Sequence, residues 1–140
     1  MESIIRSMQI DDYEAALSLW RRTPGMGLSA ADEKPELEKF LKRNATLCFV
    51  AMAGQKLTGT ILCGEDGRRG YIYHLAVDSN YQRTGIGKAL VQHALAELQR
   101  IGIQKCHLFV YGSNTSGIAF WKHNGWVMRD DIELMSIDLI

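Results

Sequence analysis

The spacing of apolar residues changes several times along the chain, and each change predicts a different element of secondary structure. Residues 3–8 alternate between apolar and polar side chains, which predicts a first strand. Residues 13–20 place apolar side chains at helical spacing, which predicts a helix capped by Asp11 or Asp12. A glycine-rich segment ends that helix, and we expect Asp32 to begin a second one.

Short strands replace helices in the next part of the sequence. Residues 47–52 and 56–63 are rich in apolar side chains, and the turn residues 53–55 between them predict a hairpin. A second turn is expected at residues 66–67. Residues 71–77 then form an uninterrupted apolar and aromatic run, which is typical of a central strand covered on both faces.

The second half of the chain alternates between helix and strand. Residues 85–99 have the apolar stripe of a helix that packs on a sheet, residues 105–111 predict a strand, and residues 114–123 predict a helix. The tail, residues 126–140, predicts two more short strands. A strand, a helix and a strand in this order imply a right-handed parallel crossover in an otherwise antiparallel sheet. We therefore expect a single mixed α/β (α+β) domain, residues 1–140, with about six to seven strands and about four helices.

The composition is that of an ordinary globular domain. The chain has 140 residues, of which 46% are hydrophobic and 23% charged, enough to build one core without disulfide or metal staples. Its 16 Lys and Arg balance its 16 Asp and Glu, so no net charge would gather nucleic acid or an anionic membrane surface. The first residues lack the pattern of a signal peptide, and no run of about 18 apolar residues occurs, so we expect neither secretion nor a membrane span.

Three cysteines, Cys48, Cys63 and Cys106, lie far apart in apolar segments and form no CxxC pair. An odd number of buried thiols is typical of a cytoplasmic protein whose cysteines stay reduced. The same spacing argues against a structural zinc site, and the histidines have no second ligand at metal spacing, so we expect no metal.

The segment most informative about chemistry is Q-R-T-G-I-G-K-A, residues 82–89, between a predicted buried strand and a predicted helix. Glycines let backbone N–H groups approach an anion closely, the helix N-terminus adds partial positive charge, and Arg83 and Lys88 add full charges. The segment therefore suits a phosphate or a pyrophosphate. It is no Walker loop, because Gln82 replaces the first glycine and Ala89 replaces the Ser or Thr, and it lacks the last small residue of the dinucleotide fingerprint.

Three stretches together resemble the signature of the GNAT superfamily, the acyl-CoA-dependent N-acetyltransferases. The glycine segment is similar to Q/R-x-x-G-x-G/A, H-L-A-V-D precedes it, and S-N-T-S-G-I-A-F-W-K-H-N-G-W is similar to the family's N-x(7)-Y-x(3)-G-F. The order of strands and helices also resembles the family fold over essentially the whole chain, and G-R-R-G-Y-I-Y-H-L-A-V and F-W-K-H-N-G-W look most like a small bacterial YpeA-like branch. The resemblance implies acetyl-CoA as co-substrate and an amine as acceptor.

The resemblance also implies how acetyl-CoA would bind. The strand before the glycine segment splays from its parallel neighbour and pairs its free backbone with the pantetheine arm, while N–H groups of the glycine segment hold the pyrophosphate. Asn114 would cap the following helix and hydrogen-bond the arm, with a plain N-cap as the alternative. Trp121 would pack or line the CoA channel. The residues assigned to acetyl-CoA in this way are Leu75, Ala76, Val77, Gln82, Arg83, Thr84, Gly85, Ile86, Gly87, Lys88, Asn114 and Trp121.

Acetyl transfer to an amine needs a base for the ammonium proton, an acid for the leaving thiolate and a donor to the thioester oxygen. The family's acid is a Tyr seven residues after the Asn, and that position is Trp121, whose indole N–H has no usable acidity. The candidate catalytic residues are therefore Tyr111, Tyr73 and His74. Histidine, with an ordinary pKa of about 6.5, suits a base, although Tyr73 and His74, on opposite faces of the predicted strand, also read as core residues. A base acting through ordered water stays open, and the N–H of Leu75 or Ala76 would serve the oxygen.

Two functions stay open on these residues. One is an N-acetyltransferase that moves acetyl from acetyl-CoA to a primary amine of a small molecule or peptide by direct attack, because no cysteine stands at a nucleophile position. The alternative is an acyl-CoA-binding regulatory or partner-binding protein with weak or no catalysis, which Trp121 favours. The acceptor groove would lie along residues 20–32 and 129–133, whose acids attract a cationic amine or merely form an exposed turn. A homodimer stays open as well.

Overall fold

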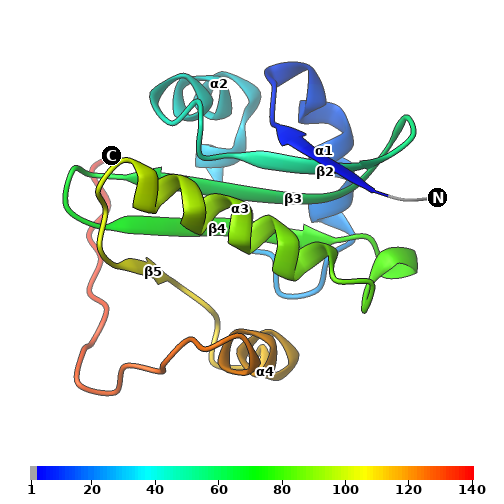
Figure 1. Cartoon of the computed structure of the whole chain (residues 1–140). Helices are drawn as coiled ribbons and strands as arrows, with labels where there is room; N and C mark the ends of the chain where they lie inside the picture. Colours follow the sequence, from blue (N-terminus) through cyan, green and yellow to red (C-terminus); the bar gives the residue numbers. More distant parts are fainter. Residues whose placement is uncertain (1–2) are drawn as a thin grey trace. The chain divides into compact units, whose positions relative to one another are not determined.

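The computed structural model describes residues 3–140, which form two compact units, the first ending at Phe109 and the second running from Val110 to Ile140. Figure 1 shows the elements in chain order. The strands are β1 (Ile4–Ser7), β2 (Phe49–Ala53), β3 (Lys56–Glu65), β4 (Gly70–Val77) and β5 (Cys106–Leu108). The helices are α1 (Tyr13–Arg21), α2 (Lys34–Arg43) and α3 (Ile86–Arg100) in the first unit and α4 (Thr115–His123) in the second. Short 3-10 turns are η1 (Ile10–Asp12), η2 (Ala30–Asp32) and η3 (Ser79–Tyr81).

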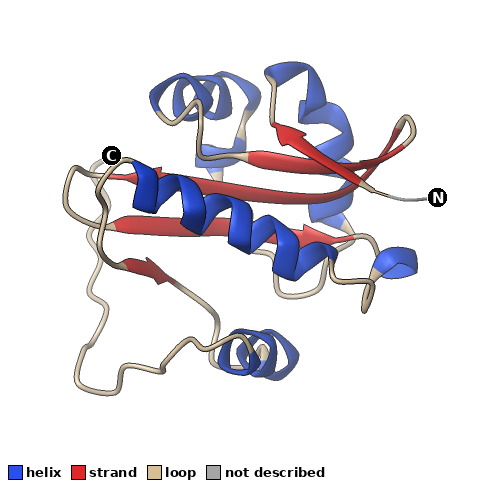
Figure 2. Ribbon diagram, in the orientation of Figure 1, coloured by secondary structure: helices blue, strands red, loops and turns tan. Residues whose placement is uncertain are grey.

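The five strands of the first unit form one sheet in the order β1-β2-β3-β4-β5 (Figure 2). Neighbours are antiparallel from β1 to β4, and β4 and β5 are parallel, as the crossover through α3 predicts. The predicted hairpin between β2 and β3 is confirmed, since Ala53 pairs with Lys56 and Gly54 turns the chain at a φ of 62°. The mixed α/β fold class is therefore confirmed.

Helices cover both faces of this sheet. Gly70 lies under α3, where an added Cβ would stand 2.6 Å from a Leu98 methyl carbon. On the opposite face, Trp20 of α1 is only 1% exposed, and its indole N–H donates to the Thr60 hydroxyl at 2.9 Å. Leu37 of α2 is buried in the same hydrophobic cluster as Trp20. The apolar stripes seen in the sequence are therefore the helix faces that pack on the sheet.

A β-bulge interrupts β4 toward its C-terminal end. Thr60 pairs with Ala76 but Leu62 pairs with Tyr73, so β4 contains one more residue than β3 across this step. His74 lies in the bulge with a positive φ of 46°, and the Thr60 hydroxyl donates to the His74 carbonyl at 2.9 Å. The prediction that Tyr73 and His74 lie on opposite faces of this strand is therefore wrong. Instead of pointing to opposite faces, Tyr73 and His74 line one cavity.

Pairing between β4 and β5 is short. The register begins with Gly70 opposite Cys106 and ends with Ile72 opposite Leu108. No further pair joins these two strands anywhere in residues 3–140, so the edge of β4 beyond Ile72 has no neighbouring strand. The two strands thus separate as the family resemblance implies for a splayed parallel pair.

Several predicted boundaries differ from the structure. Strand β5 is shorter than the predicted residues 105–111, and Asp32 ends η2 instead of beginning α2, whose N-cap is Glu33. Residues 126–140 were expected to form two strands and form none. Alternating apolar residues favour a strand, but a strand also needs a neighbouring edge that supplies its backbone hydrogen bonds. The described sheet therefore has five strands where six or seven were expected.

Candidate active site

The loop before α3 has the backbone geometry of an anion cradle. Arg83 and Gly85 both have positive φ, 63° and 87°, and Gly85 is the N-cap of α3 without any side-chain cap hydrogen bond. The first N–H groups of the helix, at Ile86, Gly87 and Lys88, are therefore left for a partner outside the helix. A Cβ built on Gly85 would meet nothing within 4 Å, so space beside these N–H groups is open.

Hydrogen bonds within the turn hold this loop in place. Asp78, at the end of β4, is buried and accepts from the Asn80 amide at 2.9 Å and from the Arg22 guanidinium at 3.0 Å. The Asn80 amide, with help from Arg22, lowers the pKa of Asp78, so this carboxylate stays ionised. The Gln82 side chain donates to the Val77 carbonyl at 3.2 Å, and the Thr84 hydroxyl donates to the Tyr81 carbonyl. Both side chains are therefore used within the loop, where they help to hold its backbone.

The free edge of β4 adjoins this loop in sequence. Leu75, Ala76 and Val77 lie beyond the last β4–β5 pair, and their backbone is the part that the resemblance assigns to a pantetheine arm. The Ala76 side chain is buried, and those of Leu75 and Val77 are half-buried. An amide-bearing arm can pair with such an edge as an added strand would. The predicted acetyl-CoA residues of the first unit are thus brought together along one strand and the turn that follows it.

A cavity of about 600 Å³ opens beside the bulge, and an imidazole and a carboxylate that contact each other line it. His74 Nε2 lies 2.6 Å from Asp32 Oδ1, and the two side chains are 14% and 12% exposed. The Trp20 ring stands 4.8 Å from the His74 ring, and the Tyr13 hydroxyl donates to the Asp32 carbonyl at 2.7 Å. A carboxylate only accepts hydrogen bonds, so it favours the tautomer with the proton on Nε2 and leaves Nδ1 as an acceptor.

The pairing of Asp32 with His74 was not predicted from the sequence. Asp32 was expected to start α2 and to serve as an acid along the acceptor groove. In the structure, its Oδ2 accepts from the Ser29 amide at 3.0 Å, which completes a capping box around η2 and aims the carboxylate at β4. The two residues are 42 positions apart, and no local pattern links them. Only the Ser29-to-Asp32 capping spacing was visible as a signal.

Tyr73 lines the same cavity and is 39% exposed. Its ring meets Phe40 of α2 edge-on, with centroids 6.0 Å apart. Burial, together with the charge of neighbouring groups such as Tyr71, raises the pKa of Tyr73. The phenol therefore stays protonated near neutral pH, where it can donate a hydrogen bond but cannot serve as a base.

Two of the three cysteines have the character of core residues, whereas Cys106 is half-buried. Cys48 and Cys63 are buried, and burial raises the pKa of the Cys48 thiol to about 11. A hydrogen bond with Cys106 and then burial raise the pKa of Cys63 as well. A protonated, buried thiol is a poor nucleophile, so these residues do not offer a covalent route for the acetyl group.

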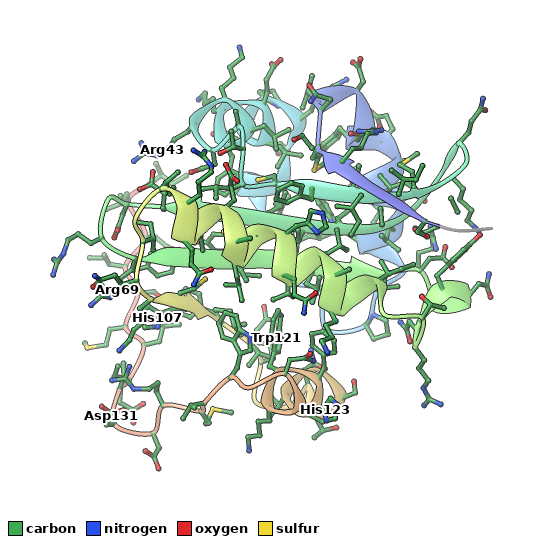
Figure 3. All side chains as sticks on the ribbon, in the orientation of Figure 1. Arg43, Arg69, His107, Trp121, His123 and Asp131 are labelled. Atoms are coloured by element: carbon green, nitrogen blue, oxygen red, sulfur yellow. The ribbon has the colours of Figure 1, made fainter. Side chains whose placement is uncertain are left out.

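Two of the predicted residues, Asn114 and Trp121, lie in the second unit. Asn114 caps α4, since its side-chain oxygen accepts from the Gly117 amide at 3.0 Å, and the predicted N-cap is confirmed. Trp121, labelled in Figure 3, packs edge-on against Phe120 and Trp126, each with ring centroids 5.1 Å away. It is half-buried within this unit. The sequence analysis gave two alternatives for Trp121, packing or lining the CoA channel. These ring contacts show the packing role.

The other second-unit candidates are exposed. The Tyr111 side chain is 62% exposed, and its backbone carbonyl accepts from the Asn114 amide at 2.9 Å. The acids expected to attract an amine, Asp130, Asp131 and Glu133, are exposed, and Asp131 pairs with Arg129 at 3.0 Å. These contacts favour the exposed-turn interpretation of residues 129–133.

Replacing Tyr111 with Phe should lower kcat more than replacing Trp121 with Phe, because only the tyrosine can donate a proton to a leaving thiolate. The expected loss for Tyr111→Phe is about 10²-fold, the lower end of what a general acid contributes. The measurement is thiol release at saturating acetyl-CoA, corrected for folded fraction by thermal melts, because Trp121→Phe removes packing within α4. A larger loss of kcat for Trp121→Phe would contradict Tyr111 as the proton donor.

Within residues 3–140, no three His, Cys, Asp or Glu side chains lie close enough together to hold a metal ion. None of the helices there is both long and apolar enough to cross a bilayer.

Comparison with known proteins assigns the chain to a family. The Acetyltransferase (GNAT) family model matches residues 13–126, which include the bulged strand, the cradle and α4. The chain therefore belongs to the GNAT acetyltransferase family, as the resemblance of its motifs implies. An acyltransferase of this family uses acetyl-CoA, so the cradle and the free edge of β4 have a co-substrate of matching chemistry.

Individual relatives agree with this family. The chain is 31% identical to Acetyltransferase SG1711 of Sodalis glossinidius, over 97% of this chain and 95% of that protein. It is 32% identical to Acetyltransferase plu1384 of Photorhabdus laumondii, over 81% and 79%. Its fold matches the PaiA N-acetyltransferase of Thermoplasma acidophilum in complex with coenzyme A, with a TM-score of 0.82, 24% identity, and coverage of 93% and 92%. The ribosomal-protein-S18-alanine N-acetyltransferase of Escherichia coli matches with a TM-score of 0.73, 26% identity, and coverage of 89% and 77%.

Proposed function

We propose that this protein is an N-acetyltransferase that transfers acetyl from acetyl-CoA to a primary amine of a small molecule or peptide by direct attack. The observation that carries the proposal is the His74–Asp32 pair, which faces a cavity at the bulge of β4 where the free edge begins. A base is what an acetyltransferase needs at this position, because an ammonium ion must lose a proton before its nitrogen can attack.

His74 is the proposed base. Asp32 holds its Nε2–H and stabilises the imidazolium that forms when Nδ1 takes the proton from the acceptor ammonium. The low exposure of both side chains supports this role, since a partly dry setting strengthens their electrostatic interaction. Direct attack accords with the burial of Cys48 and Cys63.

The remaining proposed roles belong to backbone groups and phenols. N–H groups from Arg83 to Lys88 bind the pyrophosphate, and the edge from Leu75 to Val77 pairs with the pantetheine arm. Bound acetyl-CoA supplies the thioester, and the N–H of Leu75 or Ala76 donates to its oxygen as negative charge develops. Tyr73 or Tyr111 donates the proton that the leaving sulfur needs.

We also propose that residues 1–140 act as one catalytic domain in the cytoplasm. The family match runs from residue 13 to residue 126 and so crosses the boundary between the two units. The three unpaired cysteines support a reducing compartment. Equal numbers of basic and acidic residues support a small-molecule or peptide acceptor over nucleic acid.

A second candidate function keeps the cofactor site and loses efficient chemistry. The observation that favours it is Trp121, which stands where the family motif has its proton-donating Tyr and packs against aromatic neighbours. Such a protein would bind acyl-CoA and regulate a partner.

One titration separates these functions. The purified protein is titrated with acetyl-CoA and with CoA by calorimetry, and the same preparation is assayed for thiol release with a panel of amines and peptides. Binding followed by amine-dependent thiol release supports the transferase. Binding without release from any acceptor supports the regulatory protein, and absence of binding contradicts both.

A further inference from the structure

We infer that the acceptor carries an anionic group, such as a carboxylate, several bonds away from the amine that is acetylated, and that Arg43 binds this group. The inference rests on the proposed function, because it takes the His74–Asp32 pair as the place where the amine reacts. The inference concerns the group of the acceptor that is bound at the opposite end of the same cavity from His74 and Asp32.

One face of α2 lines the cavity and carries charges in a definite order. Glu36, Lys39, Phe40 and Arg43 are spaced three, four and seven positions from the first, so they follow one another along a single helix face. Each residue advances a helix by about 1.5 Å, so Glu36 and Arg43 start about 10 Å apart along the axis. The cavity is therefore elongated along α2, with Asp32 near its N-terminal end and Arg43 at its C-terminal end.

The two ends of the cavity differ in charge. Lys39 and Glu36 pair with each other at 3.3 Å and largely cancel. Asp32 contacts the His74 imidazole and accepts from the Ser29 amide, and no Lys or Arg pairs with it among the described residues, so this end of the cavity carries a carboxylate. Arg43, labelled in Figure 3, has no ion-pair partner among the residues that the structure describes, so its end of the cavity carries a positive charge.

An apolar stretch separates the two charged ends. Phe40 and Tyr73 meet edge-on across it, and the buried Leu37 and Leu62 also line the wall. A molecule that satisfies the whole cavity has an ammonium at one end, a short apolar or extended linker, and an anion at the other. Arginine suits the anion, because its planar guanidinium donates two parallel hydrogen bonds to a carboxylate.

Two sources share this chemistry, a linear ω-amino acid and a short peptide with free N- and C-termini. The probes are therefore 6-aminohexanoate and triglycine, each compared with its own C-terminal amide, which has the same length and the same amine but no negative charge. Thiol release gives kcat/KM for each compound. For the probe that resembles the natural acceptor, we expect kcat/KM of the acid to exceed kcat/KM of its amide by about tenfold. This factor corresponds to a charge-assisted hydrogen bond of about 1.5 kcal/mol. The probe with the larger acid-to-amide ratio identifies the source.

Arg43→Gln should reduce the acid-to-amide ratio toward one, because it lowers kcat/KM for the acid about tenfold more than kcat/KM for the amide. Lys42→Gln is the matched control, because it removes a neighbouring exposed charge of α2 that does not line the cavity, and its ratio should remain that of the unchanged protein. Amides accepted as well as acids by the unchanged protein, or a ratio unaffected by Arg43→Gln, would overturn the inference while leaving the transferase intact. Absence of thiol release with every probe, despite acetyl-CoA binding, would instead contradict the proposed function and this inference with it.

Discussion

Gly85→Asp is expected to abolish acetyl-CoA binding in the concentration range where the unchanged protein saturates. The new carboxylate would stand in the open space beside the first N–H groups of α3, where the pyrophosphate is proposed to bind. Repulsion between these charges a few ångströms apart is about 3 kcal/mol at a partly exposed site, which corresponds to a Kd about 100-fold higher. Calorimetric titration with acetyl-CoA and with CoA measures the loss.

Two variants separate the effect of charge from that of shape and backbone. Gly85→Asn has nearly the same size and the same tolerance of positive φ, so it should weaken binding much less than Gly85→Asp. Gly67→Asp introduces the same residue at a φ of 88°, also into open space, but in the β3–β4 turn, and it should leave affinity unchanged. Equal affinity of Gly85→Asp and the unchanged protein would refute the cradle.

His74→Asn is expected to lower kcat by about 10²-fold to 10⁴-fold, the range that a general base contributes. Asparagine tolerates the positive φ that His74 adopts in the bulge, and the bond from the Thr60 hydroxyl goes to the backbone carbonyl, so the bulge should persist. The base itself is lost, whereas the cradle is untouched. Single-turnover and steady-state thiol release at saturating acetyl-CoA measure the effect.

The control for this variant is its affinity for acetyl-CoA, which should stay within about twofold of the unchanged protein because the cradle is intact. Asp32→Asn tests the partner. It keeps the size of the side chain but removes the charge that stabilises the imidazolium, so kcat should fall without loss of binding. A kcat for His74→Asn close to that of the unchanged protein would exclude His74 as the base and leave a water-mediated route.

The local sequence alone determined most of the helices and strands and the glycine turn before α3. The two-residue turn at Gly54, the apolar stripe of α3 and the glycine at its start depend on neighbours within a few positions. Capping, turn geometry and helical periodicity are short-range properties, and the family motif is itself a local string. These features could therefore be predicted from the sequence without knowledge of the tertiary contacts.

Only the tertiary structure decided which side chains share a site. Because β4 has one extra residue relative to β3, His74 lines the same cavity as Tyr73. Strand alternation alone predicted that the two side chains lie on opposite faces of the sheet. The contact of His74 with Asp32 joins residues 42 positions apart and depends on how η2 packs against β4. The tail, residues 126–140, shows the reverse case, since its apolar pattern favours strands and no ladder forms. Register and long-range pairing depend on the whole sheet, so they could not be derived from the order of residues in one segment.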